Sequence, residues 1–167
     1  MPPIMPTLCS KRVAGPALAI FVVASLLGPV RLAGQAGQAG QARTYRTRLS
    51  PVPIDTAMMA AIAGSGQVTA TLTGTRLTIS GTFEGLKSPA TVARLHRAQK
   101  GVRGPAVFDL VVANTPGASS TSGTLSATLD LTPTQVDDLG RERFYVQVHS
   151  EKGVAPDGSN LWGWFIK

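Results

Sequence analysis

Apolar and polar side chains alternate with a two-residue period along most of the chain after Gly66. This alternation is typical of β-strands that bury one face, and turn residues such as Gly74 separate the segments. The apolar positions of the first two segments are Val68, Ala70, Leu72, Leu77, Ile79 and Phe83. Further alternating segments follow in "GPAVFDLVVA", "LSATLDL" and "RFYVQVHS", and the chain ends on "LWGWFIK". Many short strands at regular spacing indicate an all-β sandwich or barrel.

One segment, "TPTQVDDLGRERF", departs from the alternation and predicts a short helix near 133–139. Thr132 is a suitable N-cap, and Pro133 fits the first helical position. Gln135 lies three residues after Thr132, as the sequence pattern of a capping box requires. Gly140 follows, as glycine commonly does where a helix ends.

The N-terminus has the order of a secretory signal, in which basic residues precede an apolar run. Lys11 and Arg12 come first, and the uninterrupted apolar centre, Ala17–Leu27, is eleven residues long. A spanning helix needs about 20 residues, so the pattern favours a cleaved signal over a membrane anchor. We therefore predict an exported protein, periplasmic or extracellular, with no membrane span in the mature chain.

The domain organisation follows from this signal and from the start of the alternation. We expect a signal peptide over 1–36 with cleavage somewhere in 33–42, a spacer and leader over 37–65, and a β-domain over 66–167 that has an alternative start near 46. The repeat "GQAGQAGQA" is a low-complexity spacer.

Cleavage changes both the cysteine count and the charge. The single cysteine, Cys9, leaves with the signal, which excludes a disulfide framework, a cysteine nucleophile and a thiolate zinc site in the mature chain. Three basic residues also leave, so 13 basic and 9 acidic residues remain and the net charge falls from +7 to +4. A mildly basic protein attracts anionic surfaces only weakly.

Motifs of catalysis are absent from the sequence. It contains no G-x-S-x-G elbow, P-loop, dinucleotide fingerprint or H-E-x-x-H pair. The prediction is a protein that is not an enzyme, with no catalytic residues and no cofactor.

The ordered segments "SPATVARLH", "GPAVFDL", "LTPTQVDDL", "FYVQVHS" and "PDGSNLWG" resemble the CHRD domain, named after chordin and found in many exported bacterial proteins. The resemblance covers roughly Arg46 to Lys167. It implies an immunoglobulin-like antiparallel β-sandwich, related in architecture to copper/zinc superoxide dismutase, and an unknown or binding function. Many members carry a His-x-His pair and a later Val-His-Thr. Here His96 and His149 stand at two of these positions, and Arg94 replaces the first histidine.

The two histidines raise the question of a metal site. Strand alternation points His96 and His149 away from the core, and Asp109 is the third possible ligand. Stable zinc or copper sites usually need three or four protein ligands, and Arg94 would repel a cation. We therefore predict no metal site. A metal-binding or cryptic catalytic domain centred on His96 and His149 is the alternative.

Two further groups of side chains are candidates for binding. The basic cluster Arg94, Arg97, Lys100 and Arg103 is either a set of solvated charges or a site for an envelope polyanion or a protein partner. Nucleic acid is not expected, because aromatic residues are not interleaved with these charges.

Trp162 and Trp164 lie two apart and share one face of a strand. They form either an exposed aromatic platform for sugar rings or a partner, or part of the packed interior. The sequence as a whole predicts an exported, non-enzymatic, CHRD-like domain with a binding or structural role. It predicts no oligomeric state.

Overall fold

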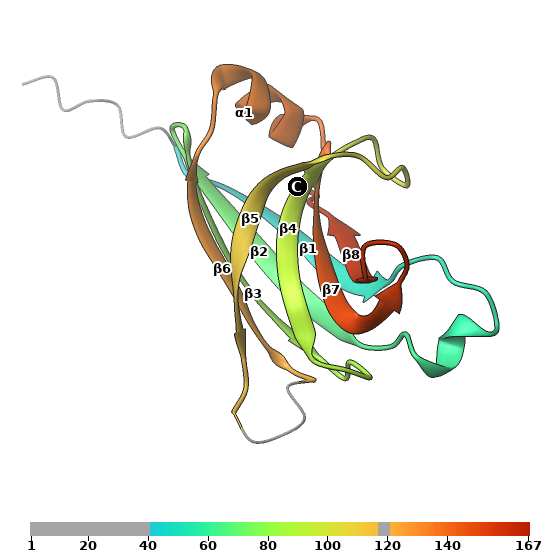
Figure 1. The fold of residues 1–167 in the computed structure, drawn as a ribbon. Helices are drawn as coiled ribbons and strands as arrows, with labels where there is room; N and C mark the ends of the chain where they lie inside the picture. The colour runs from blue at the N-terminus through green and yellow to red at the C-terminus, as the bar shows by residue number, and fades with distance from the viewer. Residues whose placement is uncertain (1–40, 117–120) are drawn as a thin grey trace, which may run out of the picture. The chain divides into compact units, whose positions relative to one another are not determined.

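The strands form a closed antiparallel barrel in a computed structural model that describes residues 41–116 and 121–167 (Figure 1). The strands are β1 (Arg43–Pro51), β2 (Ser65–Thr73), β3 (Arg76–Glu84), β4 (Ala90–Arg97), β5 (Ala106–Asn114), β6 (Gly123–Asp130), β7 (Phe144–Val154) and β8 (Ser159–Trp164). A short 3-10 helix, Met58–Ala60, lies between β1 and β2, and the helix α1 (Pro133–Gly140) joins β6 to β7.

The barrel overturns the predicted immunoglobulin-like sandwich, although the all-β prediction is confirmed. Around the barrel the strands follow the order β1, β2, β3, β6, β5, β4, β7, β8, and β8 pairs again with β1. The closing contact aligns Ser50 with Trp162 and Pro51 with Leu161. A sandwich of two sheets keeps free edges, whereas β1 here bridges β2 and β8 and removes them.

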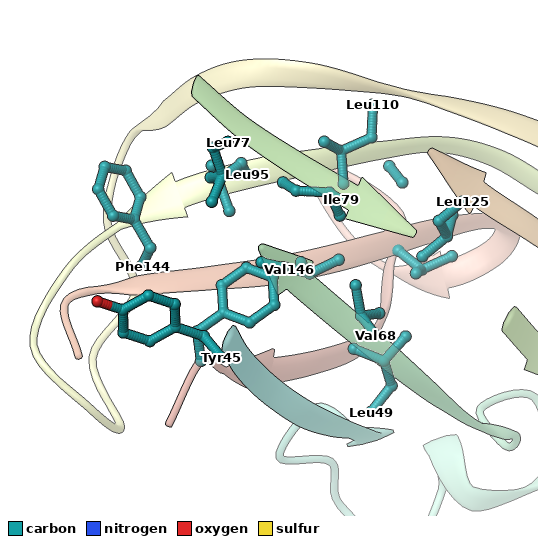
Figure 2. Close-up of a cluster of buried hydrophobic side chains, with 14 of the residues drawn as sticks. Tyr45, Leu49, Val68, Leu77, Ile79, Leu95, Leu110, Leu125, Phe144 and Val146 are labelled. Atoms are coloured by element: carbon teal, nitrogen blue, oxygen red, sulfur yellow. The ribbon is translucent and has the colours of Figure 1, made fainter. Parts of the chain in front are cut away.

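The interior of the barrel is filled by the apolar side of the alternation. The six apolar positions of the first two predicted strands are all buried, and Leu72 pairs with Leu77 while Ala70 pairs with Ile79. Figure 2 shows side chains from β1, β2, β3 and the later strands meeting in this core, among them Tyr45, Val68 and Phe144.

The helix forms where the sequence predicts it, and its N-terminus carries the expected capping box. The Gln135 N–H donates to the Thr132 hydroxyl at 3.3 Å, and the Thr132 N–H donates to Gln135 Oε1 at 2.8 Å. Figure 1 shows α1 at one end of the barrel, where Leu139 is buried in the core. The two hydrogen bonds of the capping box satisfy backbone N–H groups that have no hydrogen-bond partner within the helix.

The signal peptide predicted over 1–36, and most of the spacer, lie outside the described residues. Strand β1 belongs to the barrel and falls within the range 37–65 that was expected to be spacer and leader. Within the described segments, none of the helices combines the length and the apolar character that crossing a membrane requires.

Candidate functional site

The outer face of β4, β7 and β8 carries a row of aromatic and polar side chains. The strands lie side by side (Figure 1), and their register aligns His96 with Tyr145 and Tyr145 with Trp164. Because alternate residues of a strand share a face, the neighbouring Leu95 and Val146 point into the core. The pairing of β4 with β7 therefore places His96 and His149 on one face of one sheet.

Both histidines are buried although they lie outside the barrel core. His96 is 7% exposed and His149 is 1% exposed. Residues 98–105, between β4 and β5, supply Gly104, whose carbonyl oxygen lies 2.9 Å from His96 Nδ1. Residues 155–158, between β7 and β8, supply Asp157, whose carbonyl oxygen lies 2.7 Å from His149 Nδ1. The two loops thus hold the imidazoles against the outer face of the sheet.

These hydrogen bonds determine which nitrogen carries the proton in each neutral ring. A carbonyl oxygen can only accept, so Nδ1 is the donor in both histidines and Nε2 keeps its lone pair. Within residues 41–116 and 121–167, neither buried Nε2 atom has a hydrogen-bond partner. Burial lowers the pKa of His96; the hydrogen bond to Gly104 opposes this effect, whereas His149 and Arg94 add to it. His96 is therefore neutral at neutral pH.

Gly104 also connects the loop of residues 98–105, which covers His96, to the row of aromatic side chains. Its N–H donates to the Tyr145 hydroxyl at 3.1 Å, and the rings of Tyr145 and His96 stack with 4.9 Å between their centres. A Cβ at Gly104 would lie 2.1 Å from the carbonyl oxygen of Arg97, so only glycine fits this close approach. Gly104 and Asp157 are site residues that sequence reasoning missed, because no periodic signal marks a loop carbonyl.

Asp109, the third possible metal ligand, lies elsewhere on the sheet. It is aligned with Arg94, and Arg94 Nε lies 3.0 Å from its carboxylate on the exposed surface. In the part of the chain that the structure describes, no group of three or more His, Cys, Asp or Glu side chains could hold a metal ion. The site therefore offers two imidazole nitrogens and no third ligand of these types.

The basic cluster is divided by its ion pairs. Arg94 pairs with Asp109, and Arg97 Nε lies 2.7 Å from the buried carboxylate of Asp138. Lys100 and Arg103 lie on the loop of residues 98–105. No ion pair among the described residues includes either of them. Two of the four basic residues are thus engaged within the fold.

The two tryptophans are neither in the barrel core nor fully exposed. Trp164 is 9% exposed and stacks on Tyr145 with 4.5 Å between ring centres, while Trp162 is half-buried and meets Trp164 edge to face at 4.7 Å. Beside them is a hollow of about 290 Å³, which we call the tryptophan hollow. It is lined by Thr47, Arg48, Ser50, Lys100, Trp162, Gly163, Trp164 and Ile166.

A larger hollow of about 620 Å³ adjoins it and shares Thr47, Arg48 and Ile166 as lining residues. Arg46 also lines this hollow, together with one carboxylate, Glu84. The sequence shows Arg46 and Arg48 as basic residues of an alternating segment, but it does not show that β1 lies beside β8. Their proximity to the tryptophans therefore could not be predicted.

These features define an all-β barrel protein whose outer face carries a loop-covered cluster of histidine and aromatic side chains. The chain belongs to the CHRD domain family, since the family model described as CHRD domain matches residues 46–158. The predicted family resemblance is thereby confirmed. The matched range contains both histidines and ends before Trp162. No curated protein and no solved structure matches the chain.

Proposed function

We propose that this CHRD protein is an exported, non-enzymatic domain that binds an acidic polysaccharide, in the periplasm or outside the cell. The N-terminal order of basic and apolar residues supports export, and the absence of catalytic motifs from the sequence supports a binding role. The observation that carries the proposal is that Lys100 and Arg48 line the same hollow as the two tryptophans.

The tryptophan hollow combines the two kinds of contact that an acidic sugar needs. An indole ring has an apolar face, which packs against the C–H face of a sugar ring, and one N–H, which can donate a hydrogen bond. The ammonium of Lys100 and the guanidinium of Arg48 suit carboxylate or sulfate groups, and charge-assisted bonds are stronger than neutral ones. A neutral polymer would engage only the first kind of contact.

The surroundings of the hollow favour a polymer over a single sugar. The larger hollow continues from Arg48 to Arg46, so three cations line two adjoining depressions. Trp164 is held by stacking on Tyr145, which limits its freedom before a ligand arrives. A preformed surface loses less entropy on binding than a mobile one.

The test compares a polyuronate with a neutral glucan of similar length, using calorimetry at low salt. We expect the polyuronate to bind and the glucan to bind at least tenfold more weakly, with affinity falling as salt screens the charges. The double variant Arg48→Ala, Lys100→Ala should lose at least tenfold, since each charged bond is worth about 1.5–3 kcal/mol.

The matched control is Arg76→Ala together with Arg141→Ala. This variant also removes two positive charges, but both residues are ion-paired elsewhere, with Asp130 and Asp137. Equal losses in the two double variants would mean that only net charge matters. Equal binding of both polymers, or binding of neither, would refute the proposal and leave a protein partner as the ligand to seek.

A further inference from the structure

The imidazoles of His96 and His149 form a pair whose metal-binding nitrogens are unused within the described residues. Their ring centres are 6.3 Å apart, and their planes differ by 25°. Both Nε2 atoms are buried and lack a hydrogen-bond partner among residues 41–116 and 121–167. Buried polar atoms are rarely left in this state, so this pair of nitrogens calls for an explanation.

The loops prepare both rings in the same way for coordination through Nε2. Each Nδ1–H donates to a backbone carbonyl, at Gly104 for His96 and at Asp157 for His149. A hydrogen bond of this kind is the usual support of a metal-bound histidine, because it fixes the tautomer and the orientation of the ring. Two separate loops provide the same support, one for each histidine.

The distance between the rings agrees with one ion held between two nitrogens. A metal–nitrogen distance of about 2.0 Å, with about 1.1 Å from Nε2 to the ring centre, separates two opposed rings by about 6.2 Å. Two imidazoles arranged tetrahedrally around one ion would bring the ring centres to about 5 Å with the same bond lengths. The observed 6.3 Å is closer to the opposed, two-coordinate arrangement.

The set of ligands around the two imidazoles favours a monovalent ion that accepts two ligands. Zn²⁺ usually requires three or four protein ligands, and no third His, Cys, Asp or Glu of the described residues joins this pair. Arg94 lies on the same face of the sheet but is paired with Asp109, so the number of ligands and not the local charge selects the ion. Cu(I) is monovalent, binds imidazole and is stable with two opposed donors.

We propose that His96 and His149 bind one Cu(I) ion through their Nε2 atoms, beneath the two covering loops. Tyr145, stacked on His96, forms part of the wall of the site. This inference does not depend on the polysaccharide proposal, since the ligands are different side chains.

The experiment measures Cu(I) binding to the full chain without oxygen, by competition with a chromophoric Cu(I) chelator. Every sample carries Cys9→Ser, because a thiolate would compete for the ion. His96→Asn and His149→Asn each keep an amide N–H near the place of Nδ1 and remove Nε2. We expect one Cu(I) per chain in the parent protein, and a loss of about 100-fold or more in each variant.

The control is Met58→Leu with Met59→Leu, which removes the only two methionines of the described residues and should not change the affinity. Circular dichroism establishes that each variant is folded. Nitrogen-15 NMR provides a second measurement, since Cu(I) should shift Nε2 of both histidines and leave both Nδ1–H signals in place.

Several results would overturn the inference. These are Cu(I) affinity that is unchanged in both folded histidine variants, Nε2 signals that do not move at saturating Cu(I), or no Cu(I) binding at all. Zn²⁺ binding as tight as Cu(I) binding would overturn the assignment to a monovalent ion.

Discussion

At the scale of single residues, the most deeply buried carboxylate belongs to Asp138 of α1. Its side chain is 4% exposed and contacts two guanidinium groups, those of Arg97 on β4 and Arg143 before β7. Both arginines remain partly exposed, so each keeps part of its hydration while the carboxylate is desolvated. This arrangement connects the helix to β4 and to the start of β7, two of the strands that carry the candidate site.

Replacing Asp138 by Asn should therefore lower the free energy of unfolding by about 1–3 kcal/mol, the range for hydrogen bonds to charged groups. Asp137→Asn is the matched control, because Asp137 pairs with Arg141 on the exposed surface and should contribute less than about 1 kcal/mol. Urea unfolding of both variants measures the difference. Equal losses would contradict a structural role for the buried ion pair.

The same scale shows what alternation can predict about a site. The period of the strands correctly places His96, Tyr145 and His149 on the face opposite the core residues. It cannot predict that two loops cover this face, because burial beneath a loop depends on how the loop folds back. The histidines were therefore expected on a polar outer face and are instead nearly inaccessible.

At the scale of elements, the barrel closes where β8 meets β1, and Gly163 lies at this contact. A Cβ at Gly163 would approach the hydroxyl of Thr47 to 2.3 Å and the carbonyl oxygen of Arg48 to 2.6 Å. The backbone of β1 cannot move away without weakening its pairing with β2. Gly163 therefore allows the two strands to approach closely.

Gly163→Ala should destabilise the protein by about 1–3 kcal/mol, the usual cost of forcing extra atoms into a packed region. Gly140→Ala is the control, since a Cβ there meets nothing within 4 Å. Thermal unfolding followed by circular dichroism compares the two variants. A Gly163→Ala protein as stable as the parent would show that the β1–β8 contact is looser than described.

The elements themselves were largely predictable, and for local reasons. The capping box at Thr132 and Gln135 depends on residues three positions apart, so the helix could be predicted from that segment alone. The strand pair β2–β3 is joined by a short turn at Gly74, which makes its register a local property as well.

At the scale of the whole molecule, the architecture depends on contacts between distant segments. A closed barrel needs strand pairings that a two-sheet sandwich lacks, and one of them aligns Ser50 with Trp162, which are far apart in the chain. Alternation shows which face of each strand is buried, but it contains no signal for which strands become neighbours. The tryptophan hollow depends on this same pairing. The sequence therefore could not predict that its basic residues and its tryptophans line one hollow.

The most direct test of the proposed polysaccharide site uses the chain's own fluorescence. Trp162 and Trp164 are its only tryptophans, so its indole emission reports on this hollow alone. Titration with a polyuronate should shift the emission to shorter wavelength and protect it from an aqueous quencher, while a neutral glucan should change it much less. Emission that stays unchanged at saturating polyuronate would contradict the account.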